Sequence, residues 1–360
     1  MKRQALTHRP VPLAVIGGGA AGLFAALTAA ERGLGCLVIE RKARIGSKML
    51  MTANGRCNFT KDISAERMLV DIGEPVAGFV RPALTACPPS AVAAELTRRG
   101  LRVKRMADGR LFPASERAAD VVHIFGDALR DHSVPLLTNC PVTGIQPVKN
   151  GFIVATRSFT LWARRVLVAT GGLSFPKTGS MGDGQRFAEE LGLAVEPCRA
   201  GLVGCDADDP ALRARVGTRC ERAAAAVVAD GHELFRAEGE VEFESTGISG
   251  AAVYNCTRFI ARARPVRWDL ELETDEGRHL VRHPRLRPVK EAIVTIGGVA
   301  MDGIDPATME SRLVPGLHFA GEVLDIDGPT GGYNLTLAFA TARLAAVAAA
   351  EALGRFPACA

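Results

Sequence analysis

The stretch Val15-Ile16-Gly17-Gly18-Gly19-Ala20-Ala21-Gly22 decides the fold, because four of its eight residues are glycines that follow a short apolar run. Glycine loses much backbone entropy on folding and has no side chain to pack, so a close approach to the main chain must require it here. The run Pro12–Ile16 is typical of a strand buried on both faces, and the alanine-rich residues Leu23–Arg32 are typical of a helix. A second apolar strand, Cys36–Ile39, ends at Glu40. This order predicts a βαβ unit of the dinucleotide-binding type.

Each part of this unit has an expected role at a bound pyrophosphate. Gly17 makes the tight turn, Gly19 lets the backbone approach the pyrophosphate, and Gly22 lets the helix pack closely on the sheet. The helix N-terminus offers free N–H groups and the positive end of its dipole. The carboxylate of Glu40 would accept hydrogen bonds from ribose hydroxyls and repel a 2′-phosphate, which disfavours NADP at this site. The alternative, a glycine-rich turn in an ordinary α/β protein, does not explain why all these signals occur in register.

Composition bounds the class of protein. The chain has 360 residues, 48% of them hydrophobic, which is enough for two domains with cores, and its 23% charged residues exclude a disordered chain. A net charge of +5 suits an anionic cofactor or substrate but is too diffuse to predict nucleic-acid binding. None of the nine cysteines forms a C-x-x-C pair, so we expect no metal site, and their odd number indicates a reducing cytoplasm.

Two apolar segments need to be distinguished from targeting or membrane segments. Residues 1–10 followed by an apolar run have the outline of a signal peptide, but the run is rich in glycine and continues into a second strand, so we expect none. The first helix is interrupted by Glu31 and Arg32 and does not read as a membrane span. The last apolar stretch, 335–353, contains Arg343 and Glu351 and reads as a packed helix.

Three further stretches favour FAD over NAD as the dinucleotide. Residues 40–58 form a long polar loop, where an NAD-binding unit would soon enter its next strand or helix. Residues 165–172 read as another buried strand that ends in a small-residue turn. Residues 316–334 read as a strand, an acidic turn and a glycine-rich entry to the last helix, whose N-terminus could face the flavin edge that gains negative charge on reduction.

These stretches carry a family resemblance that extends over nearly the whole chain. The matching strings are VIGGGAAG, KMLMTANGRCNFT, GRLFPASERAADVV, LVATGGLSFPKTGSMGDGQRFAEELG, FESTGISG, AIVTIGGV and PGLHFAGEVLDIDGPTGGYNLTLAFATA. The chain resembles the BaiN and RdsA family of FAD-dependent oxidoreductases, also called HI0933-like or aminoacetone-oxidase-like flavoproteins. The resemblance implies noncovalent FAD in a glutathione-reductase-type, Rossmann-like α/β domain. The implied cofactor-binding residues are Gly17, Gly19, Ala20, Ala21, Glu40, Arg41, Lys48, Arg56, Cys57, Asn58, Val142, Thr170, Gly171, Gly321, Glu322, Asp327, Gly332, Tyr333, Asn334 and Leu335.

The expected FAD domain is discontinuous, with residues 1–193 and 288–360 flanking an inserted substrate or cap domain, 194–287. Alternating apolar and polar residues predict that the insert is β-rich, and we expect 247–250 to begin a helix with Ser249 as its N-cap. The chain departs from the family here. The segment that usually forms a helical subdomain is short, and Ser245 and Ala251 stand where a histidine and a proline are usual.

The resemblance implies hydride transfer through flavin N5. The most favoured function is NAD(P)H-driven reduction, or the reverse dehydrogenation, of a small organic substrate such as an activated C=C bond. An amine or aminoketone oxidase that uses O₂ is an alternative, and a non-catalytic or RNA-associated flavoprotein is a further one. With no second G-x-G-x-x-G, we expect NAD(P)H as a transient donor without a domain of its own. Neither nucleic acid nor membrane is an expected partner, and the oligomeric state is not predicted.

Reduction of a C=C bond also needs a proton donor within hydrogen-bond reach of the substrate. Tyr333 ranks first because it lies in the predicted cofactor loop, although its ring could instead pack against the flavin. Arg56 and Ser245 are further candidates, and Arg56 would more readily steady the flavin or a substrate anion. His318 lies inside an apolar strand and reads as a core histidine, and Cys57 reads as a packed residue without a redox role.

Overall fold

The computed structural model describes residues 4–5 and 10–354, so Cys359 and most of the first ten residues lie outside the described part. These residues form two compact units. The first contains the described residues up to Gly172, Lys177–Glu196 and those from Gly297 onward, and the second contains Leu173–Pro176 and Pro197–Ile296. The boundaries at 196/197 and 296/297 differ from the expected 193/194 and 287/288. Each lies within a strand: β11 (Val195–Gly201) contains the first boundary, and β19 (Val294–Val299), which pairs with β11, contains the second.

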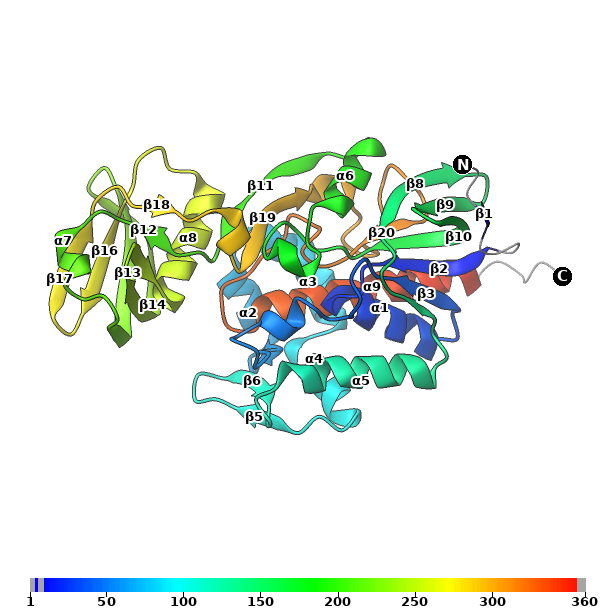
Figure 1. Ribbon diagram of the computed structural model, residues 1–360, viewed down its shortest axis with the longest axis horizontal. Coiled ribbons are helices and arrows are strands. Elements are labelled where there is room, and N and C mark those ends of the chain that lie inside the picture. The colour runs from blue at the N-terminus through cyan, green and yellow to red at the C-terminus, as the bar shows by residue number, and fades with distance from the viewer. Residues whose placement is uncertain (1–3, 6–9, 355–360) are drawn as a thin grey trace. The chain divides into compact units, whose positions relative to one another are not determined.

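A mainly parallel sheet forms the centre of the first unit (Figure 1). Its parallel strands are, in order, β7 (Leu136–Leu137), β3 (Cys36–Ile39), β2 (Val11–Ile16), β10 (Phe159–Val168) and β20 (Leu317–Phe319). The first half of β10 pairs with further strands, namely β9 (Gly151–Thr156), which in turn pairs with β8 (Val142–Val148), and the short parallel β1 (Gln4–Ala5). The expected βαβ unit and the later strand before Ala169 are therefore present.

Helices and a small sheet complete the first unit. The helices are α1 (Ala20–Glu31), α2 (Ala65–Ile72), α3 (Val76–Ala86), α4 (Pro89–Arg98), α5 (Ala118–Asp131), α6 (Asp183–Glu190) and α9 (Tyr333–Gly354). The small sheet has the order β4 (Thr60–Lys61), β6 (Arg110–Pro113) and β5 (Val103–Arg105). Short 3₁₀ helices cover Met49–Met51, Pro176–Thr178, Val289–Glu291 and Met301–Gly303.

Helices α1 and α9 lie side by side against the sheet (Figure 1) and account for much of the core. The rings of Phe24, Phe125 and Phe339 join α1, α5 and α9, with centroids 5.1 to 6.1 Å apart. Nine of the twelve residues of α1 are buried, which explains its alanine-rich composition: small side chains let the helix be covered on several sides. Helix α9 is long and apolar enough to cross a membrane, but it carries Arg343 and packs within the core, as expected of a core helix.

The second unit is β-rich, as the sequence predicted. Its sheet has the order β17 (Gly277–Val281), β16 (Asp269–Thr274), β13 (Arg219–Ala229), β14 (His232–Glu244), β15 (Gly247–Ser249), β12 (Cys205–Asp206) and β18 (Arg285–Leu286). Its helices are α7 (Pro210–Arg213) and α8 (Ala251–Ala263), and α8 packs on one face of the sheet.

The prediction that Ser249 caps a helix is wrong. Residues Gly247–Ser249 form β15, which pairs with β14 in a hairpin, and α8 begins only after Gly250. The Ser249 hydroxyl donates a hydrogen bond to the Glu244 carboxylate and caps no backbone N–H of α8. Gly250 takes the N-cap position because its φ of +105° suits glycine, and a methyl group there would lie 2.5 Å from the carbonyl oxygen of Glu240.

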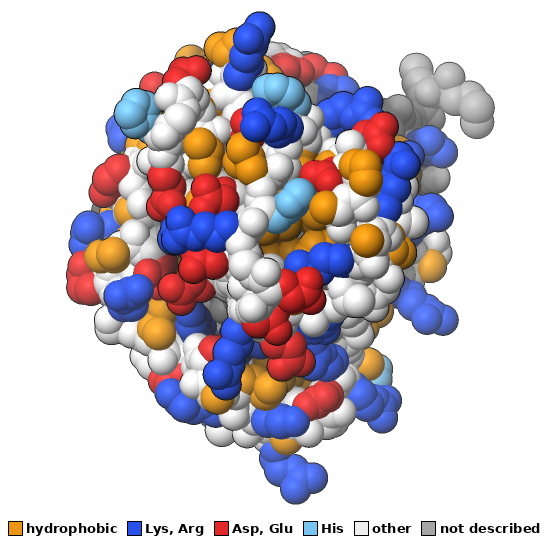
Figure 2. Space-filling model, turned by 90° about the vertical axis from the view of Figure 1, so that its left-hand side faces the viewer, with side chains coloured by type: hydrophobic (Ala, Val, Ile, Leu, Met, Phe, Trp, Pro, Cys, Tyr) orange, Lys and Arg blue, Asp and Glu red, His pale blue; other side chains and the backbone are white. Residues whose placement is uncertain are grey.

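The sheet face opposite α8 carries paired charges. Leu270 and Leu272 point into the core, so Glu271 and Glu273 between them point to the other side. Glu273 pairs with Arg236 at 3.0 Å, and Glu271 lies 3.5 Å from the guanidinium of another strand residue, Arg278. Figure 2 shows acidic and basic side chains interspersed on the face it views. This arrangement agrees with a solvated face.

Candidate functional site

The predicted cofactor residues meet at the carboxyl edge of the parallel sheet. Gly17 follows β2 and donates its N–H to the carbonyl of Ile39 in β3 at 2.8 Å. Ala169 follows β10 and donates to Ile16 at 2.8 Å, and Ala320 follows β20 and donates to Val168 at 3.1 Å. Four segments far apart in the sequence therefore end side by side. In open α/β sheets this edge is where ligands bind.

The glycine-rich turn has the geometry that the sequence predicted. Gly17 has a φ of +109°, and a methyl group on Gly22 would lie 1.8 Å from the carbonyl oxygen of Gly17, so only glycine lets α1 pack this closely. A methyl group on Gly19 would meet no other heavy atom within 4 Å, so the backbone there is open to a ligand. Gly19 is the N-cap of α1 and supplies no side-chain cap, which leaves the N–H groups of the first turn for an anion.

Glu40 is buried at the same edge and holds the turn in place. Its carboxylate accepts hydrogen bonds from the N–H of Gly18 at 2.6 Å and of Lys42 at 2.7 Å. The carbonyl of Glu40 accepts a further bond from the N–H of Cys140 at 2.9 Å, which brings the start of β8 and Val142 alongside. The carboxylate thus connects the glycine turn with the loop that follows β3, a structural role that the sequence did not predict.

The polar loop after β3 joins the glycine turn to the C-terminal segment. The N–H of Gly46 donates to the carbonyl of Gly18 at 2.7 Å, and Lys48 forms an ion pair with Glu322. The amide oxygen of Asn58, oriented to satisfy both ends of its side chain, accepts from the N–H of Gly332 at 3.0 Å. The structure therefore brings together the three loops that the sequence assigned to one cofactor.

Tyr333 begins α9 and is 3% exposed. Its hydroxyl donates a hydrogen bond to the Asp71 carboxylate at 2.5 Å, and the ammonium of Lys61 lies 3.4 Å from the same phenol oxygen. Burial and this bond to a carboxylate raise the pKa of Tyr333 well above its usual value of 10. Asp71 in turn pairs with Arg67 at 2.9 Å. The phenol is therefore protonated at neutral pH and held at both its donor and acceptor sides.

Two buried polar atoms near this edge have no hydrogen-bond partner among the described residues. They are Oγ1 of Thr170 and Oε1 of Gln185, and the amide nitrogen of Gln185 donates to the carbonyl of Gly171 at 3.3 Å. Buried polar groups are normally hydrogen-bonded. Together with the uncapped start of α1 and the open backbone at Gly19, they show that the residues of this edge fit a dinucleotide such as FAD.

The other predicted cofactor residues lie in the same unit. Arg41 pairs with Asp183 at the start of α6. The amide of Asn334 closes the C-terminal loop, because its oxygen accepts from the N–H of Gly328 and its nitrogen donates to the carbonyl of Gly328, each at 2.9 Å. The remaining members are at the start of α1, in the loop after β20 and in α9, and are Ala20, Ala21, Gly321, Asp327 and Leu335.

Arg56 and Cys57 lie in the polar loop, at its junction with the small sheet. The Nε of Arg56 donates to the carbonyl of Ala53 at 3.2 Å, and its guanidinium lies 5.3 Å from the centre of the Phe112 ring. Cys57 is fully buried, and burial raises the pKa of its thiol to about 12. A thiol with so high a pKa is a poor nucleophile, which agrees with a packed residue.

Ser245 lies in the second unit, exposed in the two-residue turn between β14 and β15. The histidine that the sequence assigned to the core, His318, is fully buried in β20. Arg165 lies 3.2 Å from its Nε2, and its Nδ1 lies 3.2 Å from the carbonyl oxygen of Thr308. Both ring nitrogens therefore have partners, and burial lowers the pKa of His318 from 6.5 to about 4.

Sequence reasoning missed three residues at this edge: Asp71, Asp183 and Gln185. Asp71 accepts from a tyrosine 262 positions away, so no local pattern indicates it. Asp183 and Gln185 belong to the string GSMGDGQ, which contributed to the family resemblance, but neither was assigned a role. A glutamine directly after Gly182-Asp183-Gly184, in the first turn of a predictable helix, was the signal that could have found the last of these.

Comparison with known proteins places the chain among flavoenzymes. The family model described as the HI0933-like protein Rossmann domain matches residues 11–348. The chain is 28% identical to the 3-dehydro-bile acid delta(4,6)-reductase of Clostridium scindens, over 94% of this chain and 99% of that protein. It is 27% identical to the ribosomal RNA dihydrouridine synthase of Escherichia coli, over 91% of this chain and 95% of that protein.

Solved structures with the same fold include two steroid dehydrogenases. The 3-ketosteroid-delta4-(5alpha)-dehydrogenase of Rhodococcus jostii RHA1 has a TM-score of 0.59 and 14% identity, over 97% of this chain and 100% of that chain. The 3-ketosteroid delta1-dehydrogenase of Sterolibacterium denitrificans has a TM-score of 0.60 and 14% identity, over 95% of this chain and 99% of that chain. At this identity the likeness concerns the fold, and it confirms the expected α/β class.

Proposed function

The chain belongs to the HI0933-like family of FAD-dependent oxidoreductases. From this premise we propose that it uses NAD(P)H to reduce a C=C bond that is conjugated to a carbonyl group in a small organic substrate. The observation that carries the proposal is the meeting of the glycine turn, the polar loop and the C-terminal loop at one sheet edge. The names of the relatives support the type of bond. A 3-dehydro bile acid with double bonds at positions 4 and 6 is a conjugated ketone, and the uracil bond that becomes dihydrouridine is also conjugated to a carbonyl.

The residues that would hold FAD are all in the first unit. The start of α1 would bind the pyrophosphate through its backbone N–H groups, and Glu40 would keep the turn rigid while its remaining lone pairs face the ribose. Thr170 and Gln185 would donate or accept at the cofactor with the atoms that have no partner among the described residues. When bound, FAD supplies hydride transfer through N5.

Tyr333 is our first candidate for the group that protonates the substrate. Its phenol carries its proton at neutral pH, although its raised pKa makes it a weak acid, so transfer would depend on stabilisation of the phenolate. Because this proton is donated to Asp71, its transfer to a substrate would require that hydrogen bond to break, and the ammonium of Lys61 is close enough to stabilise negative charge on the phenol oxygen after the proton has left. Arg56 is proposed to bind an anionic or carbonyl oxygen. Ser245 would act only on a substrate that reaches the exposed hairpin turn where it lies.

Uridine in RNA is a second candidate substrate, because two curated relatives are named ribosomal RNA dihydrouridine synthases. The described arginines on the exposed face of the second unit's sheet give little support to an RNA substrate. Arg236 pairs with Glu233 and Glu273, and Arg219 lies 3.3 Å from Glu242, so their charges are largely balanced. Phosphate binding by RNA-binding proteins depends on unbalanced positive charge. We therefore place the small-molecule substrate first.

We propose that the enzyme works in the cytoplasm. The nine cysteines of the sequence include no C-x-x-C pair, and an odd number in a chain of this length is typical of proteins that fold in a reducing compartment.

Anaerobic spectroscopy of the FAD-loaded protein tests the proposal. NADH or NADPH should bleach the flavin absorbance, and a 4,6-dien-3-one steroid or a simple enone should restore it. Bleaching by amines or aminoketones, with no response to either nicotinamide, would instead identify the oxidase alternative. Reoxidation by a uridine-containing ribosomal RNA fragment, but by none of the enones, would favour the second candidate. A protein that takes up FAD and responds to none of these donors would contradict both.

A further inference from the structure

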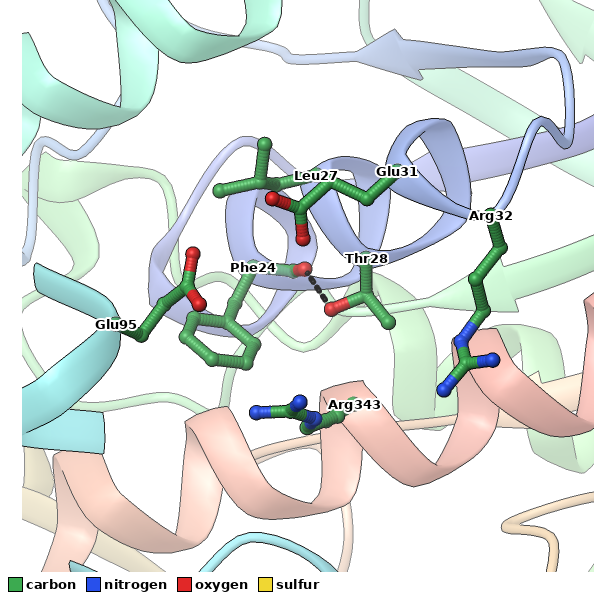
Figure 3. A pocket seen from close by; sticks show the side chains of 7 residues that line it. All are labelled: Phe24, Leu27, Thr28, Glu31, Arg32, Glu95 and Arg343. Carbon is green, nitrogen blue, oxygen red and sulfur yellow. Dashed lines mark hydrogen bonds between the residues drawn. The ribbon is translucent and has the colours of Figure 1, made fainter. Parts of the chain in front are cut away.

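A cavity of about 270 Å³ lies in the first unit, away from the edge that carries the cofactor residues. Figure 3 shows the side chains that line it, which come from α1, α4 and α9. Phe24 and Leu27 form its inner wall but are only 2% and 1% exposed, so the surface open to a ligand is mainly polar. Helix α9 begins at Tyr333 in the cofactor loop, and Arg343 stands ten positions further along. At about 1.5 Å per residue, the cavity lies roughly 15 Å from that loop.

The two carboxylates that line the cavity are neutralised by arginines of α4 and its C-terminal end. Glu31 pairs with Arg98 at 2.7 Å and also with Arg99. Glu95 pairs with Arg98 at 2.8 Å and with Arg99 at 2.7 Å. These four side chains form one balanced cluster of two positive and two negative charges. The net charge of the cavity lining is therefore determined by its other charged residues.

Those other charged members are Arg32 and Arg343, and neither has a carboxylate within 4.0 Å among the described residues. Arg343 is half-buried in an otherwise apolar helix, and its guanidinium makes only a long contact of 4.0 Å with the Sγ of Cys87. Arg32 stands at the C-terminal end of α1, and Figure 3 shows its side chain reaching toward α9. A half-buried guanidinium without a counter-ion is unfavourable unless an anion completes it.

We propose that this cavity binds a small carboxylate. The carboxylate would lie between Arg32, which is exposed at the end of α1, and the half-buried Arg343. A planar guanidinium matches a carboxylate in two parallel hydrogen bonds, which gives the site direction as well as charge. The cavity volume is just below the usual range of ligand cavities, about 300 to 1,000 Å³, so only a small molecule fits. This site is independent of the substrate proposed above.

Calorimetric titration of the FAD-loaded protein with hexanoate tests the proposal, because bound FAD keeps the anion away from the pyrophosphate site. We expect saturable binding of one hexanoate per chain. Arg343→Gln should weaken it at least about tenfold, the loss of one charge-assisted interaction of roughly 1.5 kcal/mol or more. Arg343→Lys, which keeps the charge, should bind better than Arg343→Gln. The matched control is Arg102→Gln, an exposed arginine outside the cavity, which should bind like the wild type.

Folding of each variant is checked by circular dichroism and by flavin content. No saturable binding of hexanoate to the wild type would overturn the proposal, as would equal binding to wild type and a folded Arg343→Gln protein. Inorganic phosphate that binds as tightly as hexanoate would overturn the assignment of a carboxylate ligand. None of these outcomes depends on reductase activity.

Discussion

Substitution of two glycines in the first turn separates packing from cofactor binding. In Gly22→Ala the new methyl group would lie 1.8 Å from the carbonyl oxygen of Gly17, against a limit of about 3.0 Å for real contacts, so α1 must move away from the sheet by about 1 Å. In Gly19→Ala the methyl group meets no other atom within 4 Å, and the φ of −86° at Gly19 suits alanine. The first change should damage the fold, and the second should damage only the approach of a pyrophosphate.

The sizes of the two effects follow from these distances. Overpacking usually costs about 1–3 kcal/mol, and we expect Gly22→Ala to reach about 3 kcal/mol or more because backbone, which cannot rotate away, receives the clash. Gly19→Ala should cost apo stability only about 1 kcal/mol or less, since alanine is a weaker N-cap than glycine. It should displace one charge-assisted hydrogen bond to the pyrophosphate, worth about 1.5–3 kcal/mol, and so weaken FAD binding roughly 10- to 100-fold.

Urea unfolding of the FAD-free proteins, followed by circular dichroism, measures the first quantity, and quenching of FAD fluorescence on titration measures the second. Wild-type affinity in Gly19→Ala would show that the pyrophosphate does not lie at this turn. Wild-type stability in Gly22→Ala would show that the helix can relax at little cost, and the argument from close packing would fail.

Three further substitutions or treatments test other parts of the first unit. The pKa of His318 is about 4 in the folded protein, below its usual 6.5, so the unfolded chain binds a proton more readily. The stability of the protein should therefore fall as the pH drops from about 6.5 toward 4. The urea midpoint of His318→Gln should depend less on pH in this range. Native protein treated with iodoacetamide should carry no label at Cys57 by mass spectrometry, while protein unfolded in urea should be labelled there. In Glu40→Gln, one of the two oxygens that accept from the Gly18 and Lys42 N–H groups is replaced by an amide donor. The free energy of unfolding in urea should fall by about 1–3 kcal/mol, and titrations should show weaker FAD binding.

The parts of the fold that depend on local pattern could be predicted from the sequence. Strand Cys36–Ile39 has the predicted bounds, and the last helix, expected over 335–353, covers Tyr333–Gly354. Helix α1 begins at Ala20 rather than at the predicted Leu23, so Gly22 lies inside its first turn. A glycine there lowers helix propensity, and the close contact with Gly17 that outweighs this cost is not visible in the sequence.

Features that depend on contacts distant in the sequence could not be predicted. Ser249 is a favourable N-cap by residue type, but pairing of its strand with β14 determines its backbone conformation. The residues predicted to bind FAD came mostly from the family resemblance, and Gly17 and Gly19 also from the glycine turn after a strand. The partners that position them, such as Asp71 beside Tyr333, lie on helices whose patterns indicate only burial.

The departures from the family pattern and the cofactor residues lie in different units. Ser245, Ala251 and the shortened segment after α8 are in the second unit, whereas every residue assigned to FAD is in the first. These expected differences therefore lie outside the residues proposed to bind FAD, in the unit that the sequence predicts to be a substrate or cap domain. Relatives of similar identity, 28% and 27%, carry names as different as a bile-acid reductase and an RNA dihydrouridine synthase, so identity at this level does not assign the substrate of this chain. The reaction type can accordingly be proposed from the first unit, while the identity of the substrate has to be measured.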